Sequence, residues 1–342
     1  EWYLHLKAVD GEGNWGATSH RKIRITDDVI PETSITVSPS GPDGDNGWYK
    51  SMPVIYLNSN EPATTYYQWD TTSSTWTVYS SSLTGLEGIH DFYYFSVDMA
   101  DNTETIKNTS FKIDTIKPTD PTSLTSPSHL INEFSVATTI EISFSGATDT
   151  LSGVDGFSFS FHKGTTEPPD SIKDLNENDD SLTSLPLSDG SWYFNLRTKD
   201  NAGSWTNTVH LGPFKIDTTS PTIPLLNTPS NGGSTTDKTP IFDWQDSIDA
   251  FDVVYDIVID TTPTFSTPII YETGISVSNF TSTSSLANDV YYWMIKAVDE
   301  AGYESFSDIW DFSIVSSSGG GGGGSSGTTI KRLYGQNRYY TA

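Results

Sequence analysis

Four aspartates that end similar segments are the residues in this chain best suited to bind a cation. They are Asp10, Asp98, Asp200 and Asp299, and successive members lie 88, 102 and 99 residues apart. Each follows a run of about eight residues with an apolar face and precedes a turn rich in Gly and Asn. Carboxylate and carbonyl oxygens are the ligands of hard cations such as Ca²⁺, which takes about six to eight of them. The chemistry that these residues suggest is therefore oxygen ligation of a cation.

Residue patterns typical of catalysis are weak. The chain has no cysteine, which excludes disulfides, thiol catalysis and Cys-ligated zinc. Its six histidines never pair at i and i+4, so no zinc-binding helix of the protease type is expected. Residues 323–327 match the G-x-S-x-G pattern of a nucleophile elbow, but they lie within a glycine run and not at a predicted strand-to-helix turn. No two of the 44 acidic residues stand out as a glycosidase pair. We expect no enzymatic activity.

The overall composition narrows the class of partner. With 18 Lys and Arg against 44 Asp and Glu, the net charge is −26, so we expect no nucleic-acid binding. The sequence holds no run of 18 apolar residues, so we expect no membrane span in this chain. Aromatic residues make up 13%, and turn-forming residues are abundant. This composition is typical of an extracellular all-β protein.

Alternation before each aspartate predicts a half-buried strand. At two, four, six and eight residues before the aspartate, small and then large apolar side chains recur. The intervening positions, which include Asn195, are mixed, so we expect their face to be largely wet. In the four copies, the residues two, four, six and eight positions before the aspartate are Ala8, Leu6, Leu4, Trp2; Ser96, Tyr94, Phe92, His90; Thr198, Leu196, Phe194, Trp192; and Ala297, Ile295, Trp293, Tyr291. One face of each strand should therefore lie in a core.

A second repeated signature marks where one unit ends. Phe111–Pro118 reads FKIDTIKP and Phe214–Pro221 reads FKIDTTSP, which predicts a last strand followed by a Pro-marked junction. We place sandwiches at 28–117, 118–218 and 219–316, and the last two strands of a truncated or strand-exchanged sandwich at 1–27. A Gly/Ser linker follows at 317–327. The predicted fold is all-β: tandem immunoglobulin-like sandwiches in an elongated array.

These units resemble the immunoglobulin-like and fibronectin-type-III-like repeats of archaeal and bacterial cell-surface proteins. The resemblance covers about residues 1–316 and depends on the four aspartate segments and on three shorter motifs: Gly47–Tyr49 with Pro53, Ser152–Phe157, and Pro240–Trp244. Residues 328–342 (TTIKRLYGQNRYYTA) resemble the start of a cell-wall-binding repeat. The resemblance implies the fold more strongly than a function, because such sandwiches serve many roles.

In an immunoglobulin-like topology, the aspartate turn of one sandwich should face the segment that enters from the preceding one. This arrangement predicts acidic clusters at successive junctions, which would stiffen them if they bound Ca²⁺. The alternative, that these aspartates only cap turns by accepting backbone N–H groups, stays open. The candidate ligands are Asp98 and Asp101 with Asp27 and Asp28; Asp200 with Asp114 and Asp149; and Asp299 with Asp217 and Asp246.

Other surface features point to partners. If Glu1 begins the mature protein, Trp2, Leu4 and Leu6 form an apolar strand that needs a partner, and strand donation between subunits would supply one. Asn108 and Asn279 begin glycosylation sequons. A sugar-stacking platform is a weaker hypothesis, and its candidates are Trp48, Trp69, Trp76, Trp205, Tyr66 and Tyr67.

Together these observations predict a non-enzymatic structural protein located outside the cell, at its surface. It would be a stalk, a surface-layer protein or a filament subunit that associates with its own copies. The alternative function is an adhesin, or glycan-binding accessory repeats of a secreted enzyme, with a cell-wall or surface glycan as partner.

Overall fold

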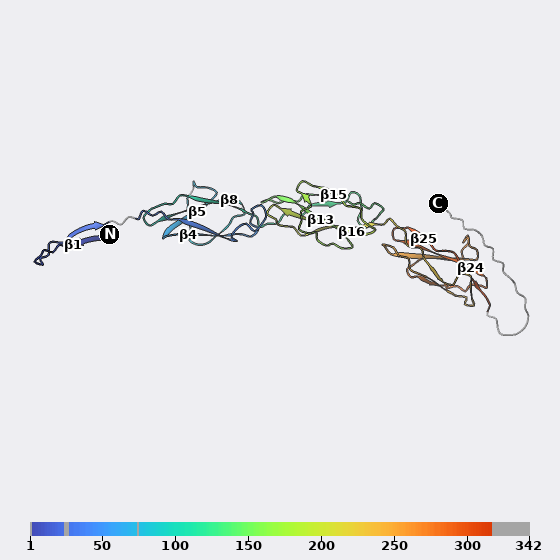
Figure 1. Cartoon of the computed structure of the whole chain (residues 1–342). Helices are drawn as coiled ribbons and strands as arrows, with labels where there is room; N and C mark the ends of the chain where they lie inside the picture. The colour runs from blue at the N-terminus through green and yellow to red at the C-terminus, as the bar shows by residue number, and fades with distance from the viewer. Residues whose placement is uncertain (1, 24–26, 74, 317–342) are drawn as a thin grey trace, which may run out of the picture. The chain divides into compact units, whose positions relative to one another are not determined.

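The predicted all-β fold of tandem immunoglobulin-like sandwiches is confirmed. The computed structural model describes residues 2–23, 27–73 and 75–316, and these contain strands, turns and no helix. The chain divides into two compact units, a first unit of Glu1–Thr218 and a second unit of Thr219–Ala342. Figure 1 shows strands joined by loops from β1 onward. No helix in these ranges is therefore long and apolar enough to cross a membrane. The predicted linker at 317–327 and the cell-wall repeat at 328–342 lie outside the described residues.

The first unit begins with a β-hairpin. Strand β1 (Trp2–Leu6) pairs antiparallel with β2 (Ser19–Ile23). Leu4 and Leu6 are 42% and 59% exposed, and no second sheet covers the hairpin among the residues that the structure describes. The hairpin therefore presents apolar side chains to solvent.

Sandwich 1 follows in the same unit, and its strands lie within the predicted range 28–117. Two sheets form it, with strand orders β3-β4-β7 and β6-β5-β8-β9. Along β8, the side chains of Phe92, Tyr94, Ser96 and Asp98 are buried and those between them are not, which is the period-two pattern expected from the sequence. The strands are β3 (Thr33–Ser38), β4 (Val54–Ser59), β5 (Ala63–Trp69), β6 (Thr77–Val78), β7 (Leu83–Thr84), β8 (Gly88–Asp98) and β9 (Lys107–Ile113).

Sandwich 2, whose strands lie within the predicted range 118–218, completes the first unit. Its sheets have the orders β10-β12-β15 and β11-β17-β16-β13-β14, and β11 pairs parallel with β17. The predicted core face of β16 is buried at Phe194, Leu196 and Thr198, but Asn195, which was expected on the wet face, is also buried, with its Oδ1 2.7 Å from Nδ1 of His210. The strands are β10 (Ser123–Thr125), β11 (Phe134–Ser135), β12 (Glu141–Ser145), β13 (Val154–Lys163), β14 (Leu175–Asn176), β15 (Ser181–Thr183), β16 (Gly190–Asp200) and β17 (Val209–Ile216).

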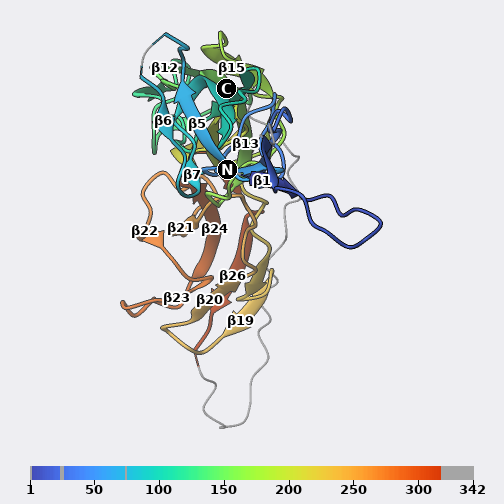
Figure 2. The same ribbon diagram turned by 90° about the vertical axis from the view of Figure 1, so that its left-hand side faces the viewer.

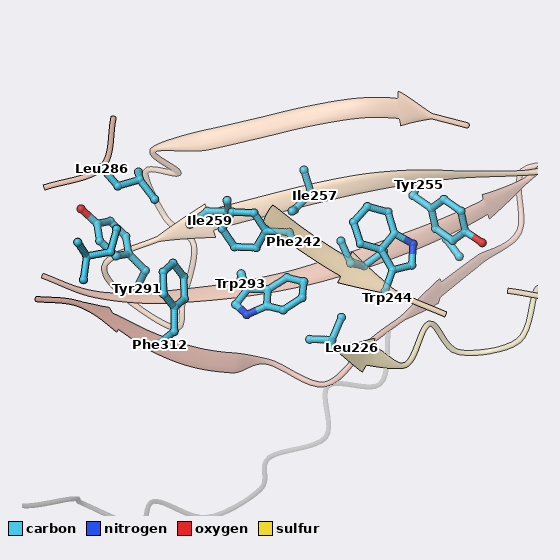
Figure 3. Packing of buried hydrophobic residues seen from close by; sticks show 13 residues of the cluster. Leu226, Phe242, Trp244, Tyr255, Ile257, Ile259, Leu286, Tyr291, Trp293 and Phe312 are labelled. Atoms are coloured by element: carbon cyan, nitrogen blue, oxygen red, sulfur yellow. The ribbon is translucent and has the colours of Figure 1, made fainter. Parts of the chain in front are cut away.

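Sandwich 3, residues 219–316, lies in the second unit. One sheet has the order β18-β20-β23 and the other β19-β26-β24-β21-β22, with β25 on β24; Figure 2 shows β22, β21, β24 and β26 side by side. In the core, the ring of Trp293 lies 5.1 Å from that of Phe242 (Figure 3). The strands are β18 (Leu226–Thr228), β19 (Gly233–Thr235), β20 (Ile241–Trp244), β21 (Val253–Asp260), β22 (Ile270–Ile275), β23 (Asn279–Thr281), β24 (Val290–Asp299), β25 (Glu304–Phe306) and β26 (Trp310–Ile314).

Glu104 holds the start of sandwich 1 to its last hairpin. Its buried carboxylate accepts hydrogen bonds from the N–H (3.0 Å) and hydroxyl of Thr33 and pairs with Lys107 at 3.1 Å. Burial by itself would raise the pKa of Glu104, but the bonds from Thr33 and Lys107 outweigh it and hold the pKa below the usual 4.5. The ionised form is therefore favoured in the folded state.

We expect Glu104→Gln to lower the stability of sandwich 1 at pH 7 by about 1.5–3 kcal/mol, because bonds to a charged acceptor become neutral. A depressed carboxyl pKa contributes stability above the unfolded value of 4.5, and this is lost as pH falls through the folded pKa. The difference between variant and wild type should thus shrink between pH 7 and pH ~3. Calorimetry at both pH values checks this, with the exposed Glu32→Gln as control; an equal difference at both would contradict it.

Candidate metal centres at the aspartate turns

The four aspartate turns share one backbone geometry. In each, the aspartate N–H donates to the carbonyl of the residue four positions on, and that residue's N–H donates back to the aspartate Oδ1. The returning bonds measure 2.9 Å at Asp10 and Asp98, 2.7 Å at Asp200 and 2.9 Å at Asp299. Turn capping, the alternative left open by the sequence, therefore does occur, and it uses Oδ1.

The turns differ at the second carboxylate oxygen. At Asp10 and Asp98 the residue four positions on is Asn, and its side-chain amide donates to Oδ2 at 3.2 and 2.8 Å. Ser204 and Tyr303 take that place at Asp200 and Asp299. Within the described part of the chain, the buried Oδ2 atoms of Asp200 and Asp299 have no hydrogen-bond partner.

One acidic cluster lies within the first unit and consists of three aspartates that were predicted together from the sequence. Carboxylate oxygens of Asp114, Asp149 and Asp200 lie within 4.8 Å of one another. Asp114 and Asp200 are 0% exposed, and Asp149 is partly buried. Asp114 follows β9 of sandwich 1, whereas Asp149 lies in a loop of sandwich 2 and Asp200 is the last residue of its strand β16. The cluster therefore spans the junction between these sandwiches.

Local hydrogen bonds fix the other two carboxylates of this trio. Asp114 accepts the N–H of Ile116 at Oδ1 (3.0 Å) and the N–H of Ser152 at Oδ2 (3.1 Å). Asp149 uses Oδ1 to accept the N–H groups of Leu151 (3.1 Å) and Gly153 (2.7 Å). Backbone N–H groups thus hold both carboxylates in place without a cation.

Burial, with the charges of Asp114 and Asp149, raises the pKa of Asp200 to about 6, although the N–H groups of Ser204 and Gly203 oppose the change. Three carboxylates converge here, and the charges of Asp114 and Asp149 disfavour ionisation of Asp200. An oxygen-seeking cation would reverse that preference.

A second cluster includes a residue that the sequence reasoning missed. Asp27 and Asp98 lie with Glu61, and their carboxylate oxygens are within 4.8 Å of one another. Burial and the charges of Asp27 and Asp98 raise the pKa of Glu61. Glu61 carries no repeat signature; only its place in the turn between β4 and β5 could have suggested it. Asp27 is exposed and Asp98 has both oxygens bonded, so this cluster is less enclosed than the first.

The remaining predicted ligands are placed differently. Among the described residues, Asp28, Asp101 and Asp246 join no group of three acidic side chains with converging oxygens. In the second unit, an oxygen of Asp249, not Asp246, lies within 4.8 Å of one from Asp299. Asp217, at the end of the first unit, is 1% exposed.

The other sequence candidates lie on or near the surface, with one exception. Asn108 in β9 and Asn279 in β23 are exposed, as glycosylation requires. Of the tryptophans proposed for a sugar platform, Trp48 is buried and the other three are partly buried: Trp69 packs 4.7 Å from Phe92, Trp76 packs 4.8 Å from Phe95, and Arg197 lies over the ring of Trp205.

Sandwich 3 has a groove that the sequence did not indicate. Its volume is about 360 Å³, and exposed rings of Tyr271 and Phe306 line it beside Met294. Lys296 also lines it, paired with Asp256 and Glu304 at 2.9 Å each. The residues of the groove come from β21, β22, β24, β25 and the loop between β21 and β22.

Comparison with known proteins adds little to this geometry. No protein-family model matches the chain, and no curated protein does. Among solved structures, the fibronectin(III)-like modules of Clostridium thermocellum CbhA are similar, with 12% identity, 60% of this chain and 100% of that chain covered, and a TM-score of 0.26. A likeness at this level carries no argument about function.

Proposed function

We propose that this chain is a non-catalytic structural protein of the cell surface, in which immunoglobulin-like sandwiches form part of a stalk, a surface layer or an extracellular filament. The observation that carries the proposal is the junction between sandwiches 1 and 2 in the first unit. There the N–H of Asp45 donates to the carbonyl of Ala202 at 2.8 Å, and Nδ2 of Asn46 donates to the carbonyl of Asn201 at 3.0 Å.

Charge reinforces the same junction. The ammonium of Lys199 in sandwich 2 pairs with Asp45 of sandwich 1 at 2.8 Å and with Asp155 of its own sandwich at 3.2 Å. Backbone bonds and a shared lysine make the contact directional, which suits a load-bearing array more than independent modules on free linkers.

The hairpin and the groove support the partners proposed with this function. Exposed Leu4 and Leu6 on a two-stranded sheet would favour association with another copy of the chain. The groove on sandwich 3 favours the second candidate function, an adhesin or glycan-binding accessory module, because exposed aromatic rings beside a charged group suit a sugar.

Electron microscopy of material shed from the native surface, with mass spectrometry to identify the chain, tests the proposal. We expect a regular filament or lattice with this chain as a repeating component. Isolated molecules that bind cell-wall polysaccharide, and lose that binding when Tyr271 and Phe306 are changed to alanine, would instead establish the second candidate function.

A further inference from the structure

One carboxylate oxygen, Oδ2 of Asp200, is buried without an explanation from the hydrogen bonds around it. Asp200 is 0% exposed, and its Oδ2 has no hydrogen-bond partner in the part of the chain that the structure describes. A buried carboxylate oxygen without a donor loses its hydration and gains nothing in return. The carboxylate of Asp200 also has an oxygen within 4.8 Å of carboxylate oxygens of Asp114 and Asp149.

The turn at Asp200 can be compared with the equivalent turns at Asp98 and Asp10 of the same chain. In the equivalent turn of sandwich 1, the side-chain amide of Asn102 donates to Oδ2 of Asp98 at 2.8 Å. The same turn at Asp10 uses Asn14 in the same way. With Ser204 at the corresponding position, Asp200 keeps the Oδ1 bond of the cap but lacks the donor to Oδ2. Turn capping therefore explains one oxygen of Asp200 and leaves the other unexplained.

We propose that Asp114, Asp149 and Asp200 bind Ca²⁺, with the unpartnered Oδ2 of Asp200 as one of its ligands. Buried charges in proteins are paired or coordinate metals. The nearest lysine in sequence, Lys199, is engaged by Asp45 and Asp155. A ligand set made only of oxygens selects a hard cation. Ca²⁺ takes about six to eight oxygen ligands, and backbone carbonyls and water would supply those that the three aspartates do not.

The location of the site adds a consequence. Asp114 belongs to the segment that leaves sandwich 1, and its Oδ2 already accepts the N–H of Ser152 from sandwich 2 at 3.1 Å. A bound cation would connect this segment to two loops of sandwich 2 and restrict motion at the junction. This inference does not depend on the surface role, since the site would act in the same way in an adhesin.

Titration calorimetry and thermal unfolding of the full chain test the site, with CaCl₂ as the probe after treatment with a chelator. Two variants isolate it: Ser204→Asn, which supplies Oδ2 with the amide found at Asp98, and Asp200→Asn, which removes the charge. Glu177→Gln, an exposed acid in another loop, is the charge-matched control. We expect the wild type and the control to gain about 5–10 °C in the unfolding midpoint of the first unit with 5 mM Ca²⁺ (about the level that saturates extracellular modules).

Both site variants should lose one equivalent of bound Ca²⁺ relative to the wild type and most of this gain, while Ser204→Asn should unfold at a higher temperature than the wild type in chelator. Comparison between variants removes the contribution of the other acidic clusters. If both variants bind as much Ca²⁺ as the wild type and gain as many degrees, the site is not a calcium site. An equal gain with MgCl₂ at the same concentration would also overturn the assignment to Ca²⁺.

Discussion

Replacing Trp293 by alanine is expected to destabilise sandwich 3 by about 3–5 kcal/mol, which is a large share of the roughly 5–15 kcal/mol that stabilises a typical domain. Trp293 lies in the middle of β24, is 0% exposed and packs against Phe242, whose ring also contacts Phe312 at 5.6 Å. Figure 3 shows these three rings between the two sheets. Alanine would leave a cavity that strands held by backbone hydrogen bonds on both sides of β24 cannot close.

Trp293→Phe separates volume from polarity at this position. Among the described residues, the buried indole Nε1 has no hydrogen-bond partner, so the tryptophan itself carries a desolvation penalty. Phenylalanine loses some volume but removes this unsatisfied donor, and we expect it to cost much less than alanine. Calorimetry of the full chain measures both, with Phe306→Ala (49% exposed) as the control. Equal losses for Trp293→Ala and Phe306→Ala would show that Trp293 is not central to the core.

Replacing Lys199 by methionine is expected to loosen sandwich 1 from sandwich 2. The side chain of Lys199 is 18% exposed, and although burial opposes its charge, hydrogen bonds to Asp45 and Asp155 raise its pKa overall. Methionine keeps the apolar stem but removes both ion pairs. Loss of bonds between charged groups of this kind should weaken the contact by about 1–3 kcal/mol, or roughly 5- to 150-fold in the docked population.

Spin labels can measure this loosening because the natural chain has no cysteine. Labels on cysteines introduced at the exposed positions Ser34 and Glu141 report the distance between sandwiches 1 and 2. We expect a narrow distance distribution in otherwise unchanged protein, a broad one in Lys199→Met, and no change in the control Lys112→Met, which alters an exposed lysine of β9. A distribution that stays narrow in Lys199→Met would mean that the ion pairs do not maintain the junction, and would remove the main support for the structural role.

These experiments separate the calcium site from the ion-paired contact at the same junction. The calcium experiment changes Asp200 or Ser204 and leaves Lys199 intact, whereas Lys199→Met leaves the three carboxylates in place. If Ca²⁺ narrows the distance distribution of Lys199→Met, the cation and the lysine stabilise the same contact by independent routes. The structural role and the cation site can therefore succeed or fail separately.

The sequence alone determined the strands and the positions of most acidic candidates. Alternation before each aspartate was enough to assign the buried face of β8, β16 and β24, because period two follows from backbone geometry. The repeat of that segment also placed Asp200 in a turn, and the direction of the chain brought Asp114 and Asp149 to the same end of sandwich 2. Local periodicity and known connectivity sufficed for these predictions.

Only the tertiary structure decided which loop residues converge and which polar atoms remain unsatisfied. Glu61 rather than Asp28 or Asp101 joins Asp98, and Asp249 rather than Asp246 approaches Asp299, because loop side chains are oriented by contacts made with other strands. Asn195 is buried on the face expected to be wet, where His210 from β17 bonds it. Among the described residues, no donor reaches Oδ2 of Asp200, and this depends on what surrounds the oxygen in space; a sequence pattern can identify the aspartate but not the lack of a donor.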